Sequence, residues 1–268
     1  MTAENHTAPL LEVCELSLVY RGASRSLPIV RNVSFSLDHG EVLGIIGESG
    51  AGKSSIGNAV IGLLAPGIAQ TAGTIRLEGT ALEAVDGKAR RALRGRAIAS
   101  IFQDPSSSLD PLMTVGAQLD ETIAALSPEL SGSDVRARAI QLLERVGIPD
   151  APRRHHSYPH QLSGGQRQRI VIAMALAGAP SLIVADEPTS ALDATVQKQI
   201  LHVLKGLVQD HGLSILLITH DMGVIAEIAD RVVVMKDGAV IEQGATAALL
   251  QAPQDPYTQR LLAAVPKL

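Results

Sequence analysis

The spacing of hydrophobic residues changes along the chain and predicts which segments are strands and which are helices. Over 11–37 they alternate with polar residues, most clearly around Val33 and Phe35, which is the period of half-buried strands. We expect this segment to form an antiparallel layer at the edge of the fold. In 41–46, a continuous apolar run follows Glu41, and a glycine-rich loop and a predicted helix over 55–64 come after it.

Helical and strand patterns alternate later in the chain. Apolar residues recur at helical spacing over 135–146 and 196–207. The second helix lies between two largely apolar runs, 182–185 and 214–219, which predicts a β-α-β unit in a parallel sheet covered by helices on both faces.

The last strand pattern, over 231–241, predicts a hairpin that turns at Asp237 and Gly238. Between 104 and 179 the sequence shows no convincing strand, so we expect a helical subdomain inserted into an α/β core. The predicted organisation is one domain over 1–268, with an α/β core of 1–103 and 180–245, a helical subdomain of 104–179 and a C-terminal tail of 246–268.

Composition and charge exclude some classes of function. Hydrophobic residues make up 46% of the chain and charged residues 19%, which is ordinary for a globular protein, and a net charge of -4 offers no basic field for nucleic acid. The single cysteine, Cys14, and an N-terminus without a signal pattern lead us to expect a cytoplasmic protein. The longest apolar stretch is about half of the ~18 residues that suggest a membrane span, so we expect membrane association only through a partner.

The loop at 47–54 carries the strongest chemical signal. It fits the pattern G-x-x-x-x-G-K-[ST] between a predicted strand and a predicted helix, as a phosphate-binding loop requires. Its backbone N–H groups would surround phosphate oxygens, while Lys53 would reach the β- and γ-phosphates and Ser54 would ligate magnesium. The predicted ATP contacts here are Gly47, Glu48, Ser49, Gly50, Ala51, Gly52, Lys53, Ser54 and Ser55.

Two carboxylates, Asp186 and Glu187, directly follow the apolar run 182–185. The carboxyl end of a parallel strand is the usual place for ligand contacts in such sheets. Asp186 suits magnesium ligation through a water molecule, and Glu187 would polarise the water that attacks the γ-phosphate. Taken alone, the pair also fits two solvated acids at a strand end.

A further small-residue motif precedes an apolar segment of good helix formers, 167–177. Ser163 can cap this helix, whose N–H groups would form a second anion site, but one without a lysine. Without a lysine, such a site needs a nucleotide that is held elsewhere. As an alternative, a lone pentapeptide of this kind also fits an ordinary helix cap. The motif consists of Leu162, Ser163, Gly164, Gly165 and Gln166.

Taken together, 47–54, 162–166 and 185–193 resemble an ABC-family nucleotide-binding domain, and the resemblance covers nearly the whole chain. It implies an α/β P-loop NTPase with a RecA-like core, an antiparallel β edge layer and an inserted helical subdomain. It also implies ATP and Mg²⁺ as cofactors and hydrolysis of the bound ATP. In this family, 162–166 corresponds to the signature motif, and the resemblance implies a head-to-tail pair in which the signature motif of one subunit completes the ATP site of the other.

The resemblance also assigns roles to residues outside these motifs. Gln103 would contact magnesium and the attacking water, His220 the γ-phosphate, and Tyr20 would stack on adenine. From the residues alone, Tyr20 also fits a core tyrosine and His220 a structural histidine. The implied D-loop consists of Ser190, Ala191, Leu192 and Asp193.

Three longer stretches, 102–111, 157–161 and 256–262, resemble the ATPase subunits of peptide and nickel importers. This implies the motor of a bacterial importer for di- or oligopeptides, or for nickel or a metal chelate, at the cytoplasmic face of the inner membrane. We expect a second, different ABC ATPase subunit, with a homodimer as the alternative, two integral membrane permease subunits and an extracytoplasmic solute-binding protein. Some members of the group hold an iron–sulfur cluster through four cysteines, and with Cys14 alone none is expected.

Three other functions compete with the importer motor. A soluble ABC ATPase acting on ribosomes or DNA is disfavoured by the single phosphate loop and the absence of a sustained heptad pattern. A regulatory or adaptor subunit that binds ATP without hydrolysing it is disfavoured by the presence of Glu187 and His220. An exporter motor is disfavoured by the three longer stretches, which follow the importer pattern.

Overall fold

The computed structural model describes residues 8–22, 26–190 and 192–263. Its contacts divide the chain into two compact units, Met1–Arg91 with Ser214–Leu268, and Ala92–Leu213. The predicted boundaries at 104 and 179 both fall inside the second unit, because the strands on either side of them group with the helices between them.

The first unit contains the antiparallel layer that the alternating pattern predicts. Its strand order is β2-β1-β4-β5, and β1 pairs antiparallel with both β2 and β4. The pattern predicted only β1 and β2, since β4 carries small and polar residues that leave most of it half-buried or exposed. The strands are β1 (Leu11–Arg21), β2 (Ser26–Leu37), β4 (Ile68–Leu77) and β5 (Thr80–Ala81).

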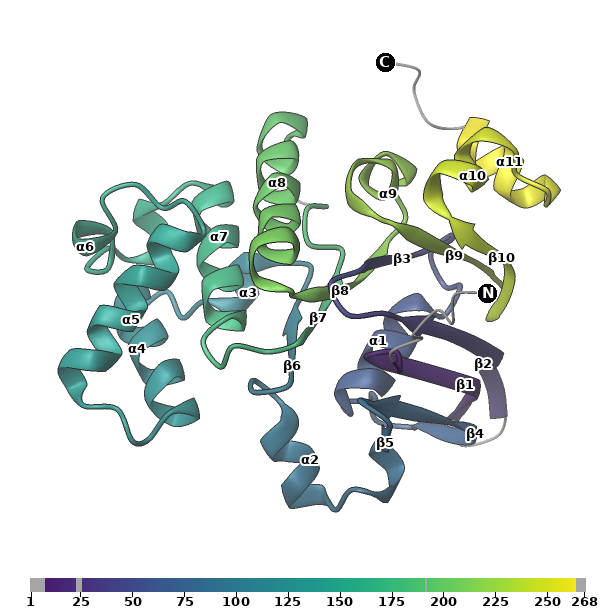
Figure 1. Ribbon diagram of the computed structural model, residues 1–268, viewed down its shortest axis with the longest axis horizontal. Helices are drawn as coiled ribbons and strands as arrows, with labels where there is room; N and C mark the ends of the chain where they lie inside the picture. Colours follow the sequence, from purple (N-terminus) through teal and green to yellow (C-terminus); the bar gives the residue numbers. More distant parts are fainter. Residues whose placement is uncertain (1–7, 23–25, 191, 264–268) are drawn as a thin grey trace, which may run out of the picture. The chain divides into compact units, whose positions relative to one another are not determined.

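Four further strands of this unit lie in the order β10-β9-β3-β8. Strand β3 pairs in parallel with β8 and β9, and every residue of β3 and β8 is buried, which explains their continuous apolar runs. Helix α1 contacts β8 and β2, while α9 contacts β3 and β8, and Figure 1 shows the two helices on opposite sides of these strands. The elements are β3 (Val42–Ile46), α1 (Lys53–Ile61), β8 (Ser214–Thr219), α9 (Met222–Ile228), β9 (Arg231–Lys236) and β10 (Ala239–Ala245).

The hairpin predicted over 231–241 is confirmed as β9 and β10. Asp237 has a φ of 48° and Gly238 a φ of 80°, and a two-residue hairpin turn needs this left-handed backbone at both positions. Beyond the hairpin, the predicted C-terminal tail contains α10 (Thr246–Gln251) and α11 (Pro256–Ala263). A short helix, η1 (Leu82–Ala84), follows β5, and α2 (Gly87–Leu93) leads from the first unit into the second.

The second unit combines two parallel strands with a group of helices, and within its described residues no strand lies between 104 and 179, as predicted. Helix α7 is central to it, since it contacts α3, α4, α5, α8 and β6. The elements are β6 (Ile98–Ile101), α3 (Pro105–Ser108), α4 (Val115–Leu126), α5 (Gly132–Arg145), α6 (Ala151–Arg154), η2 (Pro159–Gln161), α7 (Gly164–Ala175), β7 (Leu182–Asp186) and α8 (Ala194–His211).

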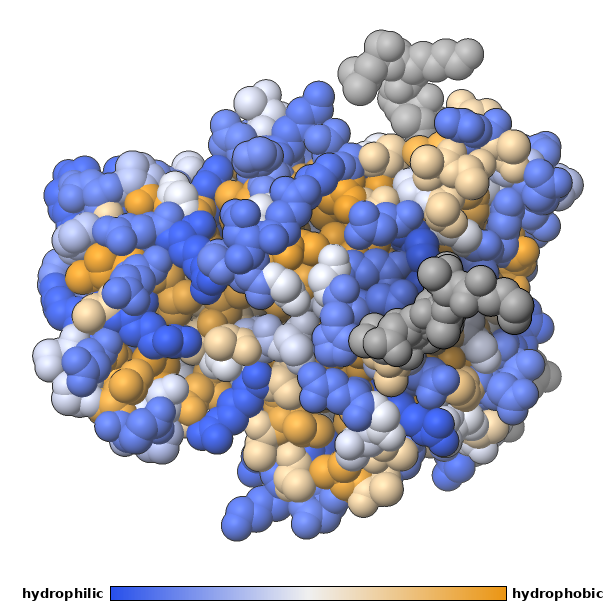
Figure 2. All heavy atoms as spheres, viewed as in Figure 1, coloured by the Kyte–Doolittle hydropathy of each residue, from blue (hydrophilic) through white to orange (hydrophobic). Residues whose placement is uncertain are grey.

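The predicted helices at 135–146 and 196–207 are confirmed as α5 and α8. In α8, the residues at helical spacing Ile200, Leu204 and Leu207 are buried. Hydrophilic side chains cover the outer face of α8 at the top of Figure 2, as expected of an amphipathic helix. Across the described part of the chain, none of the helices combines the length and the apolar character that crossing a bilayer requires.

Candidate functional site

The phosphate loop leaves the buried strand β3 and leads directly into α1, as the motif requires. Two of its positions accept only glycine. A β-carbon on Gly47 would lie 2.2 Å from the carbonyl oxygen of Met235, and one on Gly52 would lie 2.7 Å from that of Ile29. Gly52 also has a φ of 92°, a backbone conformation that residues with side chains avoid.

Lys53 lies at the base of this loop and is only 7% exposed. Its Nζ donates hydrogen bonds to the carbonyl oxygens of Gly47, at 2.7 Å, and Glu48, at 3.0 Å. Gly52, the N-cap of α1, has no side chain to accept from the first N–H groups of the helix. A helix start of this kind favours an anion, so the lysine and the helix end both favour phosphate here.

The other residues of the predicted loop differ in exposure. Buried Ala51 and half-buried Ser55 support the loop from within, whereas the remaining positions face outward. The exposed members are Glu48, Ser49, Gly50 and Ser54. The hydroxyl of Ser54 therefore lies at the surface in the first turn of α1, next in sequence to the buried lysine.

Two other predicted contacts belong to the same unit as the loop. His220 is exposed and directly follows β8, whose last residue, Thr219, pairs with Ile46 at the end of β3. Because these strands are parallel, the histidine and the phosphate loop leave the sheet at the same edge. Tyr20, one residue before the end of β1, is 42% exposed, so the alternative of a core tyrosine is wrong.

The predicted acidic pair lies in the second unit, where Asp186 ends β7 and Glu187 follows it. Both side chains are half-buried, which differs from the alternative of two fully solvated acids. Glu187 has a φ of 51°. Its backbone carbonyl oxygen accepts two hydrogen bonds from Ser190, one from the backbone N at 3.4 Å and one from the side-chain hydroxyl at 3.2 Å. Left-handed backbone at a non-glycine residue is strained, and such strain gathers at functional sites.

Gln103 is exposed and follows the strand beside β7. Strands β6 and β7 are parallel, and Ile101 pairs with Ala185 near their ends. Gln103 and the two carboxylates therefore leave their strands in the same direction, at the same edge of this pair. The amide of Gln103 and the carboxylates of Asp186 and Glu187 are each able to offer oxygen atoms to a cation.

The signature motif begins α7 with the cap that the sequence predicts. The hydroxyl of Ser163 accepts from the backbone N of Gln166 at 3.3 Å, and the side chain of Gln166 accepts from the backbone N of Ser163 at 3.1 Å. This reciprocal pair is a capping box, so the capping role of Ser163 is confirmed. Leu162 is buried, whereas Ser163 and Gly164 are exposed at the helix start.

The predicted D-loop leads into α8. The carboxylate of Asp193 accepts from the backbone N of Thr195 at 3.1 Å and of Val196 at 3.0 Å, and so caps the helix. Ser190 is exposed and Leu192 is half-buried. Ala191, the fourth member of the predicted D-loop, lies outside the described residues.

A contact that sequence reasoning missed reaches the phosphate loop from the C-terminal segment. The backbone N of Glu48 donates a hydrogen bond to the hydroxyl of Tyr257 at 3.0 Å. Tyr257 belongs to the stretch 256–262, which resembles the importer group, but the sequence alone gave it no role. The only signal was a tyrosine in an aromatic-poor chain, since a buried tyrosine usually finds a partner for its hydroxyl.

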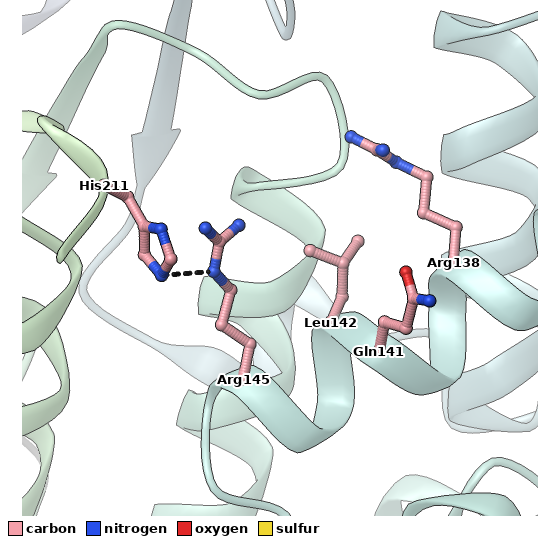
Figure 3. Close-up of a pocket in the computed structure, with 5 residues that line it drawn as sticks. All are labelled: Arg138, Gln141, Leu142, Arg145 and His211. Atoms are coloured by element: carbon pink, nitrogen blue, oxygen red, sulfur yellow. Dashed lines mark hydrogen bonds between the residues drawn. The ribbon is translucent and has the colours of Figure 1, made fainter.

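A separate hollow of about 300 Å³ lies in the second unit. Figure 3 shows Arg138, Gln141, Leu142 and Arg145 of α5 beside it, facing His211 at the end of α8. The Nε of Arg145 donates to Nε2 of His211 at 2.9 Å. Burial, with a smaller effect of Arg138, lowers the pKa of Arg145. None of the predicted site residues lines this hollow.

Comparison with curated proteins finds relatives over almost the entire chain. It is 47% identical over 97% of its length to the oligopeptide transport ATP-binding protein OppD of Mycobacterium tuberculosis, of which it covers 42%. It is 45% identical to OppD of Bacillus subtilis, with 97% of this chain and 72% of that protein covered. A putative peptide import ATP-binding protein of Brucella abortus is 44% identical, with 100% and 80% covered.

The chain thus spans less than half of the length of some curated relatives that it matches. Among solved structures, a dimeric ATP-binding cassette, MJ0796, bound to ADP and Pi has a TM-score of 0.76 at 29% identity, with 88% of this chain and 98% of that chain covered. The cbiO1 protein of Clostridium perfringens, part of an ABC transporter complex, has a TM-score of 0.78 at 27% identity, with 91% and 92% covered. The predicted cassette fold is confirmed by these two structures.

The pattern of the family described as ABC transporter matches residues 30–190, which include the phosphate loop, the signature motif and the acidic pair. The family pattern, the curated relatives and the fold shared with solved cassettes agree on this assignment. The chain belongs to the ABC transporter family.

Proposed function

We propose that this chain is the ATP-hydrolysing motor subunit of a peptide importer. The observation that carries the proposal is the phosphate loop, in which buried Lys53 and the uncapped start of α1 both favour phosphate. Peptides are favoured over nickel or a metal chelate as cargo, because the relatives at 44–47% identity are named for oligopeptide transport and peptide import.

In the proposed reaction, the loop N–H groups and Lys53 bind the phosphates of ATP, and Tyr20 stacks on adenine. Glu187 polarises the attacking water, while His220 contacts the γ-phosphate and Gln103 contacts the water. The exposed ring of Tyr20 and the exposed imidazole of His220 are both accessible to a nucleotide. The half-buried carboxylate of Glu187 is held on a strained backbone directly after β7.

The residues proposed to hold Mg²⁺ fit its chemistry. Ser54, Gln103 and Asp186 offer hydroxyl, amide and carboxylate oxygens, and Mg²⁺ prefers oxygen ligands. The hydroxyl of Ser54 is exposed one residue after Lys53, close to where the lysine would meet phosphate. When bound, the ion neutralises charge on the β- and γ-phosphates.

The signature motif supports a two-subunit site. Its helix start favours an anion but carries no lysine, so the proposal places it against ATP held by the loop of another subunit. We infer a head-to-tail pair with a second ABC ATPase subunit, beneath two permease subunits that work with an extracytoplasmic solute-binding protein. The motor would then lie at the cytoplasmic face of the membrane.

The test is to isolate the complex that contains this chain from its native membrane in mild detergent, identify its subunits and measure Mg²⁺-dependent ATP hydrolysis. Two permease proteins, a second ATPase and peptide-stimulated hydrolysis are expected. Glu187→Gln should still bind ATP but should no longer hydrolyse it. The matched control is Glu144→Gln, which makes the same substitution at an exposed residue of α5 and should hydrolyse ATP normally. Isolation with ribosomes or DNA, or substantial hydrolysis by Glu187→Gln, would contradict the proposal.

A further inference from the structure

Tyr257 connects the C-terminal helix α11 to the phosphate loop within the first unit. Its side chain is only 4% exposed, and its hydroxyl accepts a hydrogen bond from the backbone N of Glu48 at 3.0 Å. The two residues are 209 positions apart in the chain. A residue far outside the phosphate-loop motif thus contacts the backbone of that loop directly.

The contact falls on a peptide group that Lys53 also holds. The N–H of Glu48 and the carbonyl of Gly47 belong to the same planar peptide unit. Lys53 Nζ donates to that carbonyl at 2.7 Å, while the hydroxyl of Tyr257 accepts from the N–H. Because a peptide unit is rigid, contacts on both of its edges set its orientation.

The ring of Tyr257 is itself held in place. Lys236 Nζ lies 5.3 Å from the ring centroid, and the guanidinium carbon of Arg260 lies 5.9 Å from it. Both distances fall within the range of cation–π attraction. The hydroxyl therefore projects from a ring whose position is restrained by two cations and by burial.

The segment that carries Tyr257 is fastened to β10 by Glu242. The carboxylate of Glu242 accepts from the backbone N of Gln254 at 2.8 Å and of Asp255 at 3.2 Å. Asp255 in turn accepts from the backbone N of Tyr257 at 2.7 Å. Burial raises the pKa of Glu242, but the hydrogen bonds that it accepts outweigh burial and leave the pKa below its usual value.

We propose that Tyr257 is a positioning residue for nucleotide binding, whose hydroxyl holds the Gly47–Glu48 peptide in the orientation that phosphate binding requires. Gly47 has no side chain to resist rotation of this peptide, so the hydroxyl of Tyr257 adds a restraint to the one that Lys53 supplies. A loop that is already ordered loses less conformational entropy when ATP binds. This inference rests on the proposed function, because it assumes that the loop binds ATP.

The experiment compares ATP affinity in the full chain and two variants. Tyr257→Phe removes the hydroxyl and keeps the ring, whereas Gln251→Ala changes an exposed residue at the end of α10, outside the segment that carries Tyr257. Calorimetric titration with Mg-ATP gives the affinity, and hydrogen exchange at the Glu48 amide reports the contact itself. We expect Tyr257→Phe to weaken ATP binding roughly 3- to 10-fold, the value of one hydrogen bond, and to speed exchange at Glu48. Gln251→Ala should change neither.

The outcomes distinguish a failure of the proposed function from a failure of the positioning role of Tyr257. If the unaltered chain does not bind ATP, the proposed function fails and this inference fails with it. If the unaltered chain binds ATP and Tyr257→Phe binds equally well, or if Gln251→Ala weakens binding as much as Tyr257→Phe does, only the inference fails. If Tyr257→Phe does not fold, Glu242→Ala is the second variant, because it removes the carboxylate that holds the segment carrying Tyr257. Glu242→Ala should also weaken ATP binding. An ATP affinity of Glu242→Ala equal to that of the unaltered chain would overturn the inference.

Discussion

A β-carbon placed on Gly165 would lie 2.4 Å from Cγ1 of Val196. Gly165 stands in the first turn of α7, inside the signature motif, and Val196 stands in the first turn of α8. The two helices are in contact, so this glycine lets them approach closely. One position of a motif proposed to bind nucleotide is therefore also required for helix packing.

Gly165→Ala should destabilise the protein because the new methyl group collides with Val196. Overpacking of this kind costs about 1–3 kcal/mol. Denaturant unfolding would measure the loss, and adding Val196→Ala should restore most of it by making room. Gly164→Ala is the matched control, since its β-carbon would meet Leu192 at an ordinary 3.5 Å. A loss that Val196→Ala does not relieve would contradict the packing role.

Glu187→Gly should unfold at a higher temperature than Glu187→Gln, although neither should hydrolyse ATP. The φ of 51° at Glu187 costs a residue with a side chain about 1–2 kcal/mol, and only glycine escapes that cost. The larger unfolded-state entropy of glycine offsets about 0.5–1 kcal/mol of the gain. Thermal unfolding of the two variants without nucleotide measures the difference, and a less stable glycine variant would show that the backbone at 187 is not strained.

Lys53→Ala should weaken ATP binding roughly 10- to 150-fold, because it removes charge-assisted hydrogen bonds to phosphate. Calorimetric titration with Mg-ATP checks this. The control is Lys198→Ala, which removes an exposed lysine from α8 and should leave ATP binding unchanged. Equal affinity of Lys53→Ala and the unaltered chain would show that phosphate does not bind at this loop.

The free energy of unfolding should fall at alkaline pH, and ionisation of Tyr257 should account for part of the loss. Burial raises the pKa of Tyr257 and outweighs the hydrogen bond from the Glu48 backbone, which lowers it, and the carboxylates of Glu48 and Asp237 raise it further. A raised folded-state pKa gives a contribution to stability that is fully present below the usual pKa of tyrosine and is lost as pH rises through the raised value. Unfolding free energies measured across this range should fall less steeply in Tyr257→Phe, and identical slopes would show that Tyr257 does not titrate with folding.

Several features of the fold and site could be predicted from the sequence because they depend on neighbouring residues. The phosphate loop is set by glycines and a lysine within eight positions, and the cap of α7 by Ser163 and Gln166, three positions apart. The turn at Asp237 and Gly238 follows in the same way from two residues that tolerate left-handed backbone. Apolar period and continuity likewise indicated β3, β8, α5 and α8.

Other features were decided only by tertiary structure, because they depend on segments far apart in the chain. Strand β4 forms by pairing with β1, although its own residues carry little strand pattern. The exposure of Tyr20 and the contact between Gly165 and Val196 follow from how β1, α7 and α8 pack. The hydrogen bond from Glu48 to Tyr257 joins residues 209 positions apart. Local pattern specifies which element a segment forms and which of its faces is apolar, but only packing specifies which surfaces meet.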